Sequence, residues 1–138
     1  MVVTHWLVDK SALVRLAHAA ERDEWLERCR RGLVRITSPT LLETGFSARS
    51  ADDWQALVTG PPVSWFPVEY LTPAVERRAL DVQRILAARG QHRAPSVPDL
   101  LIAAAAELAG LVVLHLDKDF ELIADVTGQQ VERLAVTA

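Results

Sequence analysis

Short apolar segments alternate with helical segments along the whole chain, and this alternation limits the folds open to it more than any other feature. The predicted strands cover residues 2–8, 33–36, 63–68, 111–116 and 131–135. The internal strands are apolar throughout and lack the alternating polar face of a half-exposed sheet, which is typical of parallel strands covered on both faces. The sequence therefore predicts a single three-layer α/β/α domain over residues 1–138, with a four- to five-stranded parallel sheet.

Helical periodicity and capping signals place the helices between these strands. The expected helices cover residues 12–20, 21–31, 40–48, 52–57, 73–90 and 99–109, and a short one ends near residue 126. Ser38 and Thr72 each precede a proline, so each is predicted to cap the helix that starts there. In the helix after Thr72, one face at helical spacing is predicted to be buried, formed by Val75, Ala79, Val82 and Leu86. Residues 99–109 are apolar on nearly every side, so we expect the sheet and a second element to cover that helix.

Composition excludes several classes of protein. Cys29 is the only cysteine and the four histidines are scattered, so neither a disulfide framework nor a zinc motif is expected. The N-terminus lacks a secretory signal and no apolar run is long enough to cross a membrane, which predicts a cytoplasmic protein. The net charge of −3 argues against binding nucleic acid through a general positive field. Two divalent ions held by four carboxylates would bring that charge to about +1.

Four acidic residues fall where a parallel sheet collects its ligands. Asp9 and Asp117 each directly follow a predicted strand. Asp99 lies in the first turn of a predicted helix, and Glu43 lies one turn inside another. Ligands of open parallel sheets bind at the carboxyl ends of the strands, and helices that follow strands start at that same edge. The four side chains are therefore expected to converge, although they are far apart in the sequence.

Each acid also has an ordinary structural explanation. Asp9 and Asp117 suit helix N-caps, Asp99 suits a first turn, and Glu43 suits an exposed helical position. Together they are harder to explain in that way, because carboxylates at close range repel one another unless a cation lies between them. Ligation by oxygen alone suits a hard ion such as Mg²⁺ or Mn²⁺.

Two such ions roughly 4 Å apart activate a water and neutralise the leaving oxygen of a phosphodiester, which is nuclease chemistry. On this interpretation Asp9, Glu43, Asp99 and Asp117 are metal ligands. Ser11 is expected to hold a carboxylate or a metal-bound water in position. Asp119 is either a further ligand or the cap of the last helix, and we favour the cap.

Four motifs carry a family resemblance. They are Leu7-Val8-Asp9-Lys10-Ser11-Ala12-Leu13, Ser38-Pro39 leading into Leu42-Glu43-Thr44, Pro98-Asp99-Leu100-Leu101-Ile102-Ala103-Ala104, and Leu114-His115-Leu116-Asp117-Lys118-Asp119-Phe120. In this order they resemble the acidic motifs of PIN-domain ribonucleases and, more narrowly, of VapC-type toxins of bacterial toxin–antitoxin pairs. Any one motif is weakly specific, but four in order over essentially the whole chain are strongly so.

The resemblance implies a PIN-like fold and cleavage of RNA that depends on Mg²⁺ or Mn²⁺. It also implies a homodimer, neutralisation by a cognate VapB-type antitoxin, and contact with operator DNA only through that antitoxin. Asp9, Glu43 and Asp99 match the three most regular acids of the family. The fourth acid falls in residues 117–119, where Asp117 and Asp119 compete for the position.

The two lysines of the chain, Lys10 and Lys118, each directly follow a proposed metal ligand. We predict that at least one contacts the scissile or an adjacent phosphate, and Arg15 is a similar candidate. The alternative is that both lysines are solvated loop residues.

The apolar helix at 99–109 and two tryptophans, Trp25 and Trp54, suggest a surface for the antitoxin or for a second copy of the chain. The alternative is that these residues belong to the core, since tryptophan is highly buried on average.

Two rival functions remain open. Haloacid-dehalogenase phosphatases also place an aspartate after the first strand, but they require a second one two residues on, where this chain has Ser11. A PIN-like module that binds RNA or an antitoxin without cutting is the other alternative. The intact set of four acids argues against it, because a site without activity has no physical reason to keep carboxylates that repel one another.

Overall fold

The computed structural model describes residues 3–137 and contains one parallel sheet in the order β3-β2-β1-β4-β5. Its strands are β1 (Trp6–Val8), β2 (Val34–Thr37), β3 (Val68–Glu69), β4 (Val112–His115) and β5 (Val131–Arg133). The predicted α/β fold with a parallel sheet is therefore confirmed. The first predicted strand began at residue 2, which lies outside the described residues.

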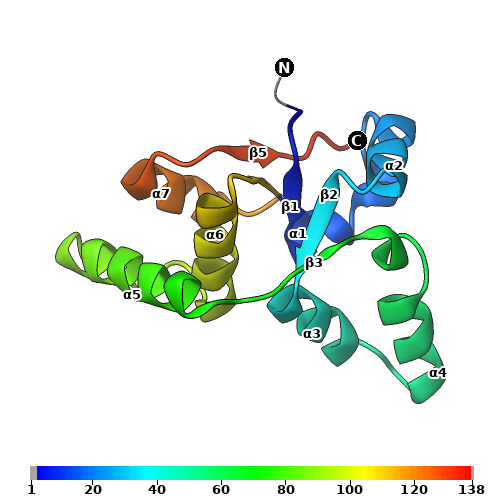
Figure 1. Cartoon of the computed structure of the whole chain (residues 1–138), viewed down its shortest axis with the longest axis horizontal. Coiled ribbons are helices and arrows are strands. Elements are labelled where there is room, and N and C mark those ends of the chain that lie inside the picture. Colours follow the sequence, from blue (N-terminus) through cyan, green and yellow to red (C-terminus); the bar gives the residue numbers. More distant parts are fainter. Residues whose placement is uncertain (1–2, 138) are drawn as a thin grey trace.

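Helices cover both faces of the sheet, with α5, α6 and α7 on one side and α1 and α2 on the other (Figure 1). The helices are α1 (Lys10–Leu13), α2 (Arg22–Arg30), α3 (Ser38–Phe46), α4 (Ala51–Trp54), α5 (Pro73–Ala88), α6 (Val97–Ala109) and α7 (Lys118–Thr127). Side chains of β1 alternate between the two cores, because successive residues of a strand point to opposite faces. Leu7 joins the core beneath α5–α7, whereas Trp6 and Val8 join the core beneath α1 and α2.

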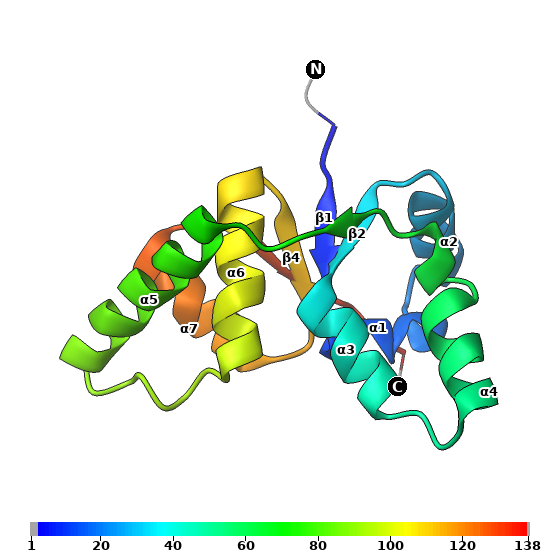
Figure 2. The ribbon, with the colours of Figure 1, turned by 60° about the horizontal axis from the view of Figure 1, so that its bottom comes forward.

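The apolar helix α6 is an internal element. It contacts β1 and β4 on one side and α5 and α7 on the other, and Figure 2 shows it between α5 and the sheet. The predicted stripe of α5 faces it and is buried, namely Val75, Ala79, Val82 and Leu86. Both predictions, the double covering of α6 and the buried stripe of α5, are confirmed.

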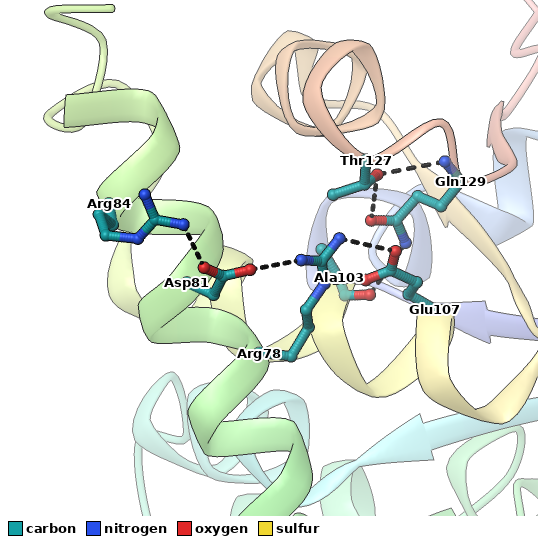
Figure 3. A network of polar contacts seen from close by, with 7 residues as sticks. All are labelled: Arg78, Asp81, Arg84, Ala103, Glu107, Thr127 and Gln129. Atoms are coloured by element: carbon teal, nitrogen blue, oxygen red, sulfur yellow. Dashed lines mark hydrogen bonds and ion pairs between the residues drawn. The ribbon is translucent and has the colours of Figure 1, made fainter. Parts of the chain in front are cut away.

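A polar network joins α5 to α6 at the outer edge of this layer (Figure 3). Arg78 donates to both carboxylate oxygens of Glu107, through Nε at 2.7 Å and Nη2 at 3.1 Å. Its Nη1 also donates to Asp81 at 2.7 Å, and Arg84 donates to the same carboxylate at 2.6 Å. Gln129, after α7, donates through Nε2 to a backbone carbonyl of α6 at 2.9 Å.

The helix predicted over residues 12–20 is wrong in its length. The chain forms α1, then a separate 3₁₀ turn, Leu16–His18, and then leaves the helical path. Ala19 forms an antiparallel bridge with Val136, and the amide of Ala20 donates to the carbonyl of Ala135 at 2.8 Å. This pairing with the far end of the chain ends the helix, and no local pattern in the sequence encodes it.

The strand predicted over residues 63–68 is also mostly wrong. Val63–Trp65 is a 3₁₀ turn, and β3 begins only at Val68. Pro67 has no amide hydrogen to donate to a neighbouring strand, which limits β3 to a short edge strand.

Two smaller corrections concern α3 and Trp25. Thr37, not Ser38, caps α3, because the Thr37 hydroxyl accepts the amide of Thr40 at 3.3 Å. Trp25 is a core residue, packed edge-on against Trp6 with 5.0 Å between ring centroids. Within residues 3–137, no helix combines the length and the apolar run that crossing a bilayer requires.

Candidate metal centre

The chain changes direction across the sheet at β1. From β1 it passes to β2 and β3 on one side, and it then returns to β4 and β5 on the other. In open parallel sheets such a reversal opens a crevice at the carboxyl ends of the two strands involved. Asp9 directly follows β1, and Asp117 follows β4 after one intervening residue. The topology therefore places both carboxylates at this crevice.

Asp9 is nearly fully buried, and Ser11 holds its carboxylate. The side chain of Asp9 caps α1, since its Oδ2 accepts the backbone amide of Ser11 at 3.0 Å. The same Oδ2 accepts the Ser11 hydroxyl at 2.6 Å. Ser11 Oγ in turn accepts the backbone amide of Leu116 at 2.9 Å, which ties α1 to the end of β4. The expected contact between Ser11 and a carboxylate is present.

Asp117 caps α7, because its Oδ1 accepts the amide of Asp119 at 2.9 Å. The expectation that Asp119 caps this helix is therefore wrong, because Asp117 occupies the cap and Asp119 follows in the first turn. Asp119 instead faces the other acids: one carboxylate oxygen each from Asp99, Asp117 and Asp119 lies within 4.8 Å of the others. Burial and then the charge of Asp117 raise the pKa of Asp119.

Asp99 lies in the first turn of α6, in a capping box with Ser96. The Ser96 hydroxyl accepts the amide of Asp99 at 3.2 Å, and Oδ2 of Asp99 accepts the amide of Ser96 at 3.4 Å. Burial raises the pKa of Asp99 to about 6, with further increases from the charges of Asp9 and Asp117. A bound cation would favour the charged form of this carboxylate and so oppose the increase in its pKa.

Glu43 approaches the same place from α3. Its Oε1 is buried and has no hydrogen-bond partner among residues 3–137. Burial and then the charge of Asp9 raise the pKa of Glu43, whereas the charge of Lys10 lowers it. A buried carboxylate oxygen without a donor is costly, so it calls for a ligand.

The five carboxylates line one open cavity of about 420 Å³, formed by Asp9, Glu43, Asp99, Asp117 and Asp119. The structure thus brings together all four acids predicted as ligands and adds Asp119. A cavity of similar size, about 430 Å³, lies between α5 and α6, but apolar side chains such as Leu80 and Val97 form most of its wall. We assign the functional site to the acidic cavity, because five carboxylates converge there at the strand-order reversal.

The residues of the acidic cavity fit a hard divalent cation. Every donor is an oxygen. Burial, and then the charges of Asp9 and Asp117, raise the pKa of Glu43, Asp99 and Asp119, and a cation relieves this repulsion between carboxylates. The unpartnered Oε1 of Glu43 is available for coordination.

The three basic residues predicted to contact RNA differ in their surroundings. Lys10 lines the cavity, and its ammonium group donates to Ser47 Oγ at 2.6 Å and to the backbone oxygen of Glu43 at 3.3 Å. Lys118 is the first residue of α7, and Arg15 follows α1; both are exposed.

Sequence reasoning missed two residues that hold the acids in place. His115 is fully buried at the end of β4, and its Nδ1 accepts the amide of Asp117 at 3.1 Å. Burial lowers the pKa of His115, so the ring stays neutral and Nδ1 is free to accept. Ser96 was detectable, because serine three residues before an acid is a capping-box signature. His115 carried no comparable signal.

Comparisons with known proteins agree with this geometry. The PIN domain family model matches residues 6–126. Ribonuclease VapC2 of Mycobacterium tuberculosis is 58% identical over 134 residues, covering 97% of this chain and 95% of that protein.

Solved structures give the same result for the fold. VapBC-5 of Mycobacterium tuberculosis, from the VapBC family of toxin–antitoxin systems, aligns with a TM-score of 0.64 and 27% identity, covering 97% of this chain and 100% of the other. The DNA-bound VapBC of Salmonella typhimurium aligns with a TM-score of 0.74 and 20% identity, covering 95% and 98%. The chain therefore belongs to the PIN-domain family, in its VapC branch.

Proposed function

We propose that this protein is a metal-dependent endoribonuclease and the toxin of a toxin–antitoxin pair. One observation carries the proposal: five carboxylates from three helix starts and one helix interior line a single cavity at the strand-order reversal. One buried carboxylate oxygen there has no hydrogen-bond partner among residues 3–137. The 58% identity to a protein named as a VapC ribonuclease supports RNA as the substrate.

Asp9, Glu43, Asp99 and Asp117 would hold Mg²⁺, or alternatively Mn²⁺, with Asp119 as a further ligand. When bound, such an ion supplies an activated water and neutralises charge on the scissile phosphate. Ser11 orients the Asp9 carboxylate, and Ser96 orients that of Asp99. Asp9 and Asp99 are nearly fully buried, so water screens their electrostatic interactions less than it would at an exposed surface.

Lys118 and Arg15 are proposed to contact RNA phosphates. Neither side chain forms an ion pair or hydrogen bond with any of residues 3–137, so both are available to an anionic chain. Lys118 lies between two of the acids, and Arg15 is next to Val14, which lines the cavity. A phosphate contact by Lys10 also stays a prediction, although its ammonium group already binds α3.

A VapB-type antitoxin is the proposed partner, since the solved relatives are VapBC complexes. Trp25 and most of α6 are buried, so they are not available to contact a partner. Trp54, the other tryptophan considered from the sequence, has 42% of its surface exposed. It packs so closely on α3 that a side chain at Gly45 would collide with its indole. Leu42 and Phe46 extend this exposed apolar surface along α3. We further propose a homodimer in the cytoplasm, which reaches operator DNA only through the antitoxin.

Incubation of the purified protein with RNA tests the activity. The wild-type protein should cleave RNA in the presence of Mg²⁺ or Mn²⁺, and cleavage should stop when EDTA is added. Asp9→Asn keeps the shape of the side chain but removes its charge, so it should lose cleavage while retaining the wild-type circular dichroism spectrum. If a folded wild type cleaves none of a broad set of RNAs with either ion, the alternative of a binding module that does not cut is correct.

A further inference from the structure

Lys10 forms a bridge between two of the acid-bearing helices. It is the first residue of α1, directly after Asp9, and its ammonium group reaches the last turn of α3. There it donates to Ser47 Oγ at 2.6 Å and to the backbone oxygen of Glu43 at 3.3 Å. The Ser47 hydroxyl donates to that same backbone oxygen at 3.2 Å.

The backbone oxygen of Glu43 depends on these side chains. It is one of the last four carbonyls of α3, which have no regular partner within a helix. The amide of Ser47 would be its usual donor, but that amide donates to the carbonyl of Thr44 at 3.2 Å. Lys10 and Ser47 Oγ therefore supply its hydrogen bonds, and the positive charge of Lys10 suits the C-terminal end of a helix.

In the part of the chain that the structure describes, the carboxylate of Glu43 lacks the hydrogen bonds that Asp9, Asp99 and Asp117 accept. Asp9 accepts two hydrogen bonds, and Asp99 and Asp117 accept one each. Within residues 3–137, no donor reaches the buried Oε1 of Glu43. The place of this carboxylate is therefore set by the position of its helical turn, and Lys10 bonds to that turn.

We propose that Lys10 is a positioning residue, whose bridge holds the Glu43 turn of α3 against the Asp9 turn of α1 and so preforms the cation site. This inference rests on the proposed metal site. It assigns Lys10 a role through Glu43, separate from the predicted contact with an RNA phosphate.

Charge and position have opposite effects on cation binding here. As a positive charge beside the cavity, Lys10 repels a divalent cation, so removal of the charge alone tightens cation binding. As a positioning residue, its removal loosens the site and weakens cation binding. Lys118 provides the matched control, because it also directly follows a proposed ligand but forms no side-chain hydrogen bond within the described residues.

The test is calorimetric titration of Mn²⁺, without RNA, into wild type, Lys10→Met, Lys10→Arg and Lys118→Met. Lys10→Met should raise the dissociation constant for Mn²⁺ roughly tenfold, as loss of residues that orient metal ligands does. Lys10→Arg should stay within a few-fold of wild type, because a guanidinium still donates to the Glu43 carbonyl. Lys118→Met should bind Mn²⁺ as tightly as wild type or more tightly.

Cleavage assays give a second readout. The kcat of Lys10→Met should fall at limiting Mn²⁺ and recover at excess Mn²⁺, whereas loss of a phosphate contact alone would raise the KM for RNA at any Mn²⁺ concentration. Circular dichroism reports whether the variant folds, and Lys10→Gln replaces it if it does not.

The inference is overturned if Lys10→Met binds Mn²⁺ as tightly as wild type does. If that variant also has a higher KM for RNA, Lys10 contacts a phosphate instead. Wild type that takes up no cation would overturn the metal site itself, and the Lys10 inference with it.

Discussion

The hydroxyl of Ser11 donates a 2.6 Å hydrogen bond to Oδ2 of Asp9. The same hydroxyl oxygen accepts the backbone amide of Leu116, 105 positions further along the chain. One side chain thus orients a proposed metal ligand and joins the ends of the two strands that form the crevice.

Ser11→Ala should weaken cation binding by roughly 10- to 100-fold, because Asp9 loses its short hydrogen bond. It should also lower the free energy of unfolding by about 1–3 kcal/mol, because the Leu116 amide loses its partner. Calorimetric titration and urea unfolding measure the two effects. Ser11→Thr keeps the hydroxyl and is the control; equal cation affinities for wild type and Ser11→Ala would contradict the prediction.

Without divalent cations, the protein should lose stability as the pH rises from about 4 to about 6. The pKa of Asp99 is about 6 in the folded protein, above its ordinary value of 3.8, so the folded state binds more protons in this range. The free energy of unfolding therefore falls through this range, by at most about 3 kcal/mol, and stays lower above it.

Thermal unfolding in EDTA across this pH range measures the effect. Asp99→Asn should reduce the loss of unfolding free energy with rising pH, and saturating Mn²⁺ at pH 7 should restore the stability of wild type. A pH profile that Asp99→Asn leaves unchanged would assign the fall to other groups.

Lys118→Ala and Arg15→Ala should each weaken RNA binding and reduce the salt slope of the binding constant by about one, as the loss of one phosphate contact does. Fluorescence anisotropy with labelled RNA, at several salt concentrations, gives both quantities. Arg31→Ala is the control of equal charge, because Arg31 lies between α2 and β2, at the opposite edge of the sheet. An equal slope for all three variants would show that only net charge matters.

Arg78→Ala should lower the free energy of unfolding by about 1–3 kcal/mol, because Glu107 loses two hydrogen bonds in a half-buried position. Arg84 pairs with the same network from an exposed position, so Arg84→Ala should cost no more than about 0.5 kcal/mol. Urea unfolding of both variants makes the comparison. Similar losses of unfolding free energy for the two variants would mean that burial of the Arg78–Glu107 pair does not add to stability.

The convergence of Asp9, Asp99 and Asp117 was predictable because each lies beside a strand end or a helix start. Asp9 and Asp117 are indeed helix caps, and Asp99 indeed belongs to a first turn. The structural explanation therefore holds for residues that we also propose as metal ligands. Capping fixes the backbone, and the topology then directs the carboxylates into one cavity.

Contacts between distant segments were not predictable. The bridge from Lys10 to Ser47 spans 37 positions, and no local pattern links the two residues. The choice between Asp117 and Asp119 as the cap of α7 depends on where β4 ends, which sequence patterns fix only to within a few residues. The conformations of β3 and of the segment after α1 depend on pairing with strands or residues remote in sequence. Local sequence propensity therefore predicted both segments incorrectly.

The place of β4 inside the sheet has a consequence for synthesis of the protein. Because β4 pairs with both β1 and β5, the strand that brings Asp117 and Asp119 to Asp9 is translated after most of the chain. A product truncated before β4 carries Asp9, Glu43 and Asp99 but lacks the strand that pairs with β1 and leads into Asp117 and Asp119. Under the proposed function, such a product lacks two carboxylates of the metal site, so that site is completed only once the ribosome has nearly finished the chain.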